Sequence, residues 1–144
     1  MKLVRTTLVM GLLLNVLGWT GNVFLLGDMW DRAGTIAPPP LEAPYPALMQ
    51  EALTFVSDFV FAFVLAAVFK LASKGWIGSR IALAVACGFL VWLGGVPPTY
   101  LGIVNSGYLP AGIAVATSLW ALVTFIVTAP ILLWLNPSPA PQAN

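Results

Sequence analysis

One acidic residue of this sequence lies deep within a long apolar segment. Asp58 is at the centre of FVSDFVF (residues 55–61), in an apolar run over residues 47–69. A charged aspartate at that depth in a membrane costs on the order of 3 kcal/mol, and the apolar segments contain no lysine or arginine that would offset it. We therefore expect Asp58 to be protonated, or to be held by hydrogen bonds or by another subunit. Such a carboxylate can take up and release a proton or a cation.

A strip of small and polar residues runs along the first apolar segment. Gly11, Asn15, Gly18 and Asn22 are spaced four, three and four residues apart, which places them on one face of a helix. Small residues let membrane helices approach closely, and amide side chains form hydrogen bonds between them. At ~1.5 Å per residue, Asn15 and Asp58 lie at similar depth. We expect Asn15 to face Asp58, with Asn22 as a further candidate.

Two tryptophans belong to the same layer. Trp92 precedes and Trp120 follows the turn over residues 105–110 by similar distances, so a hairpin of two helices brings them to the same depth. A buried indole N–H usually needs an acceptor. Two interpretations are open: the rings contact the layer around Asp58, or they face lipid or a partner.

The chain is poor in groups that do covalent or metal chemistry. It has no histidine and a single cysteine, Cys87, within an apolar run. Histidine is the commonest metal ligand and general base near pH 7, and one cysteine makes neither an internal disulfide nor a CxxC pair. Six basic residues against five acidic ones, with no basic stripe, disfavour nucleic acid as a partner. We expect no catalytic residues, no metal site and no enzyme activity.

The elements that carry these residues follow from composition. Of 144 residues, 60% are hydrophobic and 8% are charged, against roughly 25% charged in an average soluble domain. A helix needs ~20 apolar residues to cross a membrane. The sequence therefore predicts one all-α domain over residues 1–144, an integral membrane bundle of four transmembrane helices. Its predicted spans are residues 8–26, 47–69, 81–101 and 111–135.

Basic residues predict the orientation of this bundle. Lys2 and Arg5 precede the first span, and Lys70, Lys74 and Arg80 lie between the second and third, whereas only Arg32 is on the opposite side. Since basic residues concentrate on the cytoplasmic side, we expect both termini to be cytoplasmic.

The connection over residues 27–46 is predicted to be a proline-rich, non-helical outer loop. Its prolines make it stiff and extended, and it is either a docking surface or a simple spacer. The residues that would dock are Trp30, Pro38, Pro39, Pro40 and Tyr45. The tail over residues 136–144 is also rich in proline and cannot continue a helix.

Prolines are predicted to disturb two of the spans. Pro97 and Pro98 follow two glycines near the outer end of the third span, where they bend or unwind the helix. This feature is either a broken helix that lines a site or a kink that leads into the outer turn. Pro130 is expected to kink the fourth span.

The whole chain resembles, loosely, the small four-helix bacterial inner-membrane proteins of unknown function. The resemblance is carried by GDMW (residues 27–30) after a polar and small first helix, by GFLVWLGG (residues 88–95), and by the closing helix with Trp120 and Pro130. It implies a fold and no activity.

Two functions remain open from the sequence. The first is a non-catalytic accessory or structural subunit of a larger membrane-embedded energy-conversion complex, respiratory or photosynthetic, which it stabilises through helix, lipid and loop contacts. No cofactor is expected, although a bound lipid, a quinone or a pigment without histidine ligation stays open. The alternative is a small oligomeric proton- or cation-coupled transporter or channel that uses Asp58.

Overall fold

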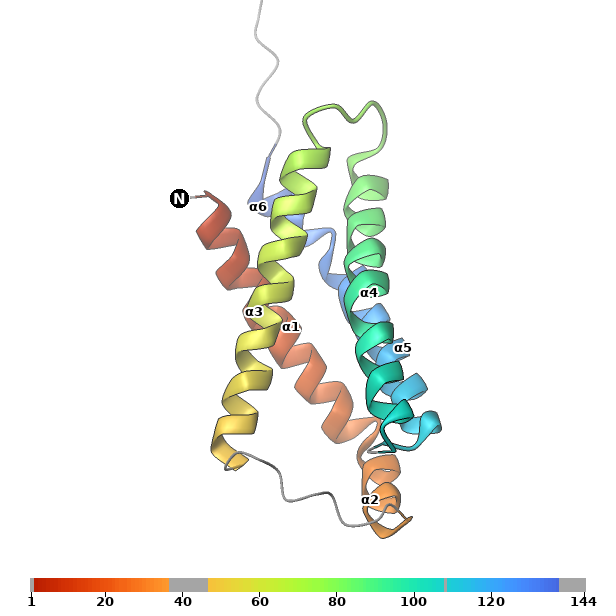
Figure 1. Ribbon diagram of the computed structural model, residues 1–144. Coiled ribbons are helices and arrows are strands. Elements are labelled where there is room, and N and C mark those ends of the chain that lie inside the picture. Colours follow the sequence, from red (N-terminus) through yellow and green to blue (C-terminus); the bar gives the residue numbers. More distant parts are fainter. Residues whose placement is uncertain (1, 37–46, 108, 138–144) are drawn as a thin grey trace, which may run out of the picture.

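The protein is a bundle of helices (Figure 1). The computed structural model describes residues 2–36, 47–107 and 109–137, and every element in these ranges is a helix. Four helices are long and apolar enough to cross a membrane, which indicates a multi-pass membrane protein. The elements are α1 (Lys2–Phe24), α2 (Gly27–Ile36), α3 (Ala47–Ala72), α4 (Arg80–Asn105), α5 (Ala111–Thr128) and α6 (Ile131–Leu135).

The helices pack as two pairs. α1 lies along α3, α4 lies along α5, and contacts of α1 with α5 and of α3 with α4 join the pairs. Figure 1 shows that α3 and α4 diverge toward the end that carries α2. Lys2 and Leu135 lie at the opposite end of the bundle, which we call the termini end.

The apolar core occupies the half of the bundle near the termini end. Its largest fully buried apolar side chains are Met10, Leu65, Phe69 and Leu132, which come from α1, α3 and α6. Hydrogen bonds between the two ends of the chain close this half: Arg5 donates to the Leu135 carbonyl at 3.3 Å, and the Asn136 amide donates to the Thr6 hydroxyl at 3.3 Å. The half that carries α2 has no comparable core among the described residues.

Local signals explain where α4 begins and ends. The Ser79 hydroxyl accepts a hydrogen bond from the Ala82 backbone N–H and caps the first turn, as serine commonly does at a helix start. After Asn105 the chain leaves the helix through Gly107, whose φ of +76° is accessible to glycine at little cost.

The first connection differs from the sequence prediction. The non-helical loop predicted over residues 27–46 is wrong for its first ten residues, which form α2. Asp28 lies in the first turn of α2, where the helix dipole stabilises a negative charge. Arg32 follows four residues later, a spacing at which opposite charges stabilise a helix. Residues 37–46, with Pro38, Pro39, Pro40 and Tyr45, lie outside the described residues, as does the tail from residue 138.

The prolines have different effects in the two spans. Of the two alternatives at Pro97 and Pro98, the broken helix is wrong, because α4 continues through both to Asn105; the kink stays a prediction. Each proline removes one backbone donor, but α4 has 26 residues and packs against both α3 and α5, which holds the helix together. Pro130 does interrupt the fourth span, since α5 ends at Thr128 and α6 begins at Ile131.

Candidate functional site

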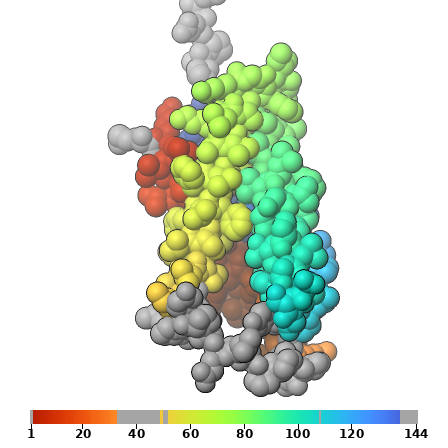
Figure 2. All heavy atoms as spheres, in the orientation of Figure 1, coloured from red at the N-terminus to blue at the C-terminus, as the bar shows by residue number. Residues whose placement is uncertain are grey.

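A cavity of about 820 Å³ lies in the half of the bundle that carries α2. Its walls come from α1, α3, α4 and α5. Figure 2 shows it as a hollow between α3 and α4, with α1 behind. Its lining residues are Leu14, Asn15, Gly18, Trp19, Asn22, Thr54, Phe55, Ser57, Asp58, Phe61, Val96, Thr99, Tyr100, Ile103, Thr117, Trp120, Ala121, Thr124 and Phe125.

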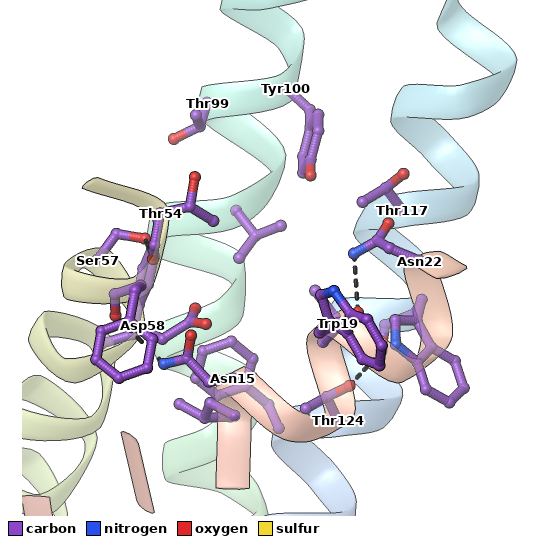
Figure 3. Close-up of a pocket in the computed structure, with 18 of the residues that line it drawn as sticks. Asn15, Trp19, Asn22, Thr54, Ser57, Asp58, Thr99, Tyr100, Thr117 and Thr124 are labelled. Atoms are coloured by element: carbon purple, nitrogen blue, oxygen red, sulfur yellow. Dashed lines mark hydrogen bonds between the residues drawn. The ribbon is translucent and has the colours of Figure 1, made fainter. Parts of the chain in front are cut away.

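Asp58 projects from α3 into this cavity (Figure 3) and is half-buried. No hydrogen bond joins its carboxylate to another of the described residues. None of the six basic residues of the chain lines the cavity. The carboxylate therefore lies on the cavity wall without a hydrogen-bond or ionic partner among the residues that the structure describes.

Asn15 lines the same cavity and lies beside Asp58 in Figure 3. Its amide N–H donates to the backbone carbonyls of Gly11, at 3.1 Å, and of Phe55, at 3.2 Å. The second bond joins α1 to α3 one turn before Asp58. Asn15 thus fixes the helix that carries the acid, and its donors are used on backbone oxygens.

Asn22 lies farther along the same wall of the cavity. Its amide donates to the Gly18 carbonyl at 2.9 Å, and its side-chain oxygen accepts from the Trp30 indole at 3.3 Å. Trp30 comes from α2 and is half-buried against α1. The side chain expected in a docking surface is therefore turned toward the bundle.

The two deep tryptophans are separated by the structure. The Trp120 indole lines the cavity and donates to the Leu17 carbonyl of α1 at 3.0 Å. The Trp92 indole donates to the Ser118 carbonyl of α5 at 2.8 Å and packs against the apolar core. Both indoles have acceptors, but only Trp120 belongs to the wall around Asp58.

The glycines of α1 have unequal roles in packing. A Cβ at Gly11 would overlap the Phe59 ring, so this glycine lets α3 approach α1. The prediction of helix packing is wrong for Gly18, which has open space beside it and borders the cavity. Gly21, which sequence reasoning missed, is buried against the Trp120 indole.

Sequence reasoning also missed the hydroxyl groups of the cavity. Thr117 is 4% exposed, and its hydroxyl oxygen has no hydrogen-bond partner among the described residues. Tyr100 lines the same cavity and is drawn with Thr117 in Figure 3. Single hydroxyls in apolar helices carry little signal in one sequence, because most of them bond to their own helix.

Most other hydroxyl groups of the cavity donate hydrogen bonds to backbone carbonyls of their own helix. Thr99 donates to Gly95 at 2.7 Å, Thr124 donates to Trp120 at 3.0 Å, and Ser57 donates to Thr54 at 2.7 Å. Their hydrogens are occupied by backbone carbonyls. The groups best placed to serve a ligand are therefore the carboxylate of Asp58 and the hydroxyl of Tyr100.

One carboxylate is the charged group of this cavity among the described residues. Across the described ranges, no three histidine, cysteine, aspartate or glutamate side chains gather in a way that could hold a metal ion. Cys87 is buried in the apolar core and does not line the cavity. A lone carboxylate beside hydroxyls and aromatic rings can hold a proton or a cation.

Comparison of the chain with family models, curated proteins and solved structures finds no match.

Proposed function

We propose that this chain is a small proton- or cation-coupled membrane transporter that works through Asp58. The observation that carries the proposal is the position of this carboxylate on the wall of an 820 Å³ cavity without a basic neighbour. Ionisable residues inside membrane spans commonly mark proton relays or ion pathways. A carboxylate that exchanges a proton for a cation couples the movement of one to the movement of the other.

The two unequal halves of the bundle support this proposal. Access to Asp58 exists from the half that carries α2, whereas the core around Met10 and Phe69 closes the termini end. A carrier that alternates between the two sides of a membrane has this form in one of its states. The second state would open the termini end.

We also propose that the termini end faces the cytoplasm of a bacterial inner membrane. Five of the six basic residues lie at or near this end, and the sixth, Arg32, lies in α2 at the other end. The five are Lys2, Arg5, Lys70, Lys74 and Arg80. This asymmetry agrees with the cytoplasmic excess of basic residues in membrane proteins. The cavity would then lie in the periplasmic half of the membrane.

Flux through purified protein tests the proposal. The protein is reconstituted in liposomes that contain a pH-sensitive dye, and a proton or cation gradient is imposed. We expect flux in the wild-type protein, its loss in Asp58→Asn, and its retention in Asp28→Asn, an exposed acid of α2 that serves as the matched control. Wild-type flux equal to that of empty liposomes, or unchanged flux in Asp58→Asn, would refute it.

A second candidate function is that of a non-catalytic accessory subunit of a larger membrane complex. The observation that favours it is the start of α3, where the five consecutive residues 52–56 are all exposed. A helix packed inside one bundle buries at least one face, so an exposed full turn leaves room for a partner chain or for lipid.

Native mass spectrometry of a mild-detergent extract distinguishes the two candidates. An accessory subunit appears at fixed stoichiometry with a much larger assembly. A free monodisperse homo-oligomer contradicts that role and agrees with a transporter.

A further inference from the structure

The charge and the rings around the cavity together define a class of ligand. Among the residues that the structure describes, Asp58 is the sole charged side chain on the cavity wall. The basic residues of α3, of α4 and of the connection between them lie at the termini end, beyond the core. They are Lys70, Arg80 and Lys74. An ionised Asp58 therefore gives the cavity a net negative charge that this chain does not neutralise.

Aromatic residues line the same cavity as this charge. They come from all four long helices: Trp19, Phe55, Phe61, Tyr100, Trp120 and Phe125. Phe61 and Phe125 meet edge to face with centroids 5.9 Å apart, and the Trp120 ring is fixed by its bond to Leu17. Ring faces attract organic cations such as quaternary ammonium groups, and the attraction is larger away from water.

The size and the mouth of the cavity narrow the class further. A volume of about 820 Å³ is in the usual range for ligands of drug size, ~300–1,000 Å³, and far exceeds the space that a single inorganic ion needs. The hollow opens sideways between α3 and α4 (Figure 2), on a surface that would face lipid. A ligand that enters there must be soluble in the membrane.

We propose that the cavity binds a lipophilic organic cation, whose charge lies against the Asp58 carboxylate and whose apolar groups lie among the six rings. Either a free membrane-soluble cation or the amine headgroup of a lipid supplies this chemistry. The inference rests on the proposed transport function for its biological meaning, but binding is measured apart from flux, so that each can fail alone.

Binding of tetraphenylphosphonium to the purified full chain in neutral detergent tests the inference. Tetraphenylborate has nearly the same shape with the opposite charge, so it serves as the control ligand. We expect wild-type protein to bind the phosphonium at least about tenfold more tightly than the borate, because one favourable charge contact of 1.4 kcal/mol changes affinity by a factor of ten. Equal binding of both ions overturns the proposal without the need for any variant.

Variants then locate the site. Asp58→Asn should weaken phosphonium binding about tenfold or more, and Tyr100→Leu about threefold or more through loss of one ring, whereas Asp28→Asn should leave it unchanged. Unchanged affinity in both cavity variants overturns the assignment. In neutral detergent, competition of added phosphatidylethanolamine with the phosphonium indicates a lipid amine as occupant, and absence of competition indicates a free cation.

Discussion

The contact between Gly21 and Trp120 permits a sharp test of how α1 and α5 pack. Gly21 is buried, and a Cβ built on it would overlap the Trp120 indole. Gly18, one turn earlier on the same helix, has nothing within 4 Å of its own Cβ position. The substitutions Gly21→Ala and Gly18→Ala therefore add the same atom to the same helix in two different surroundings.

The expected magnitudes follow from three contributions. Alanine favours a helix over glycine by about 1 kcal/mol, which both variants gain. In Gly21→Ala the displaced indole costs ~1–3 kcal/mol through overpacking, and its 3.0 Å bond to the Leu17 carbonyl, worth ~1 kcal/mol, is lost. We expect Gly18→Ala to be up to about 1 kcal/mol more stable than the wild type, and Gly21→Ala to be ~1–3 kcal/mol less stable.

Equilibrium unfolding in mixed micelles, followed by far-UV circular dichroism as sodium dodecyl sulfate is added, measures this difference. The midpoint should shift in opposite directions for the two variants. Equal midpoints, or a lower midpoint for Gly18→Ala than for Gly21→Ala, would refute the packing of α5 on α1 described above.

Three further predictions concern other parts of the bundle. Trp92→Phe removes the hydrogen bond to Ser118 and should lower the unfolding free energy by about 1 kcal/mol in the same micelle assay. Cys87 is buried, so a maleimide should label it in sodium dodecyl sulfate and leave it unlabelled in mild detergent; rapid labelling in both would contradict its position. In a chain that carries Cys87→Ala, an impermeant maleimide added to intact cells should label Asp31→Cys and spare Ser73→Cys, and the reverse pattern would invert the orientation.

The sequence predicted the four spans because apolar length is a strong and local signal. The helices extend a few residues beyond the predicted spans: α1 begins at Lys2 and α4 ends at Asn105. Polar residues at the two ends of an apolar segment can belong to the same helix, and apolar length alone does not include them. α2 was missed because it is short and polar, and its residues carry no long apolar run.

The candidate site was predictable only in part. Asp58 is conspicuous in any apolar segment, and the spacing of Asn15 and Asn22 on α1 indicated one wall of the cavity. Tyr100 and Thr117 were missed because each is ordinary in its own helix. Their proximity arises from the pairing of α4 with α5, which depends on contacts between distant segments rather than on local pattern.

The hydrogen bonds at the termini end constrain the conformational change that transport of a ligand would need. Arg80 donates to the Asn136 carbonyl at 2.9 Å, and Arg5 and Thr6 bond to the same short segment after α5. This segment follows the interruption at Pro130, and its Leu132 and Leu135 side chains are buried in the core. A second state that exposes Asp58 to the termini end must break these bonds and separate α6 from α1. A protein that only binds its ligand can keep these bonds. Movement of α6 between two positions when the ligand binds therefore distinguishes transport from simple binding.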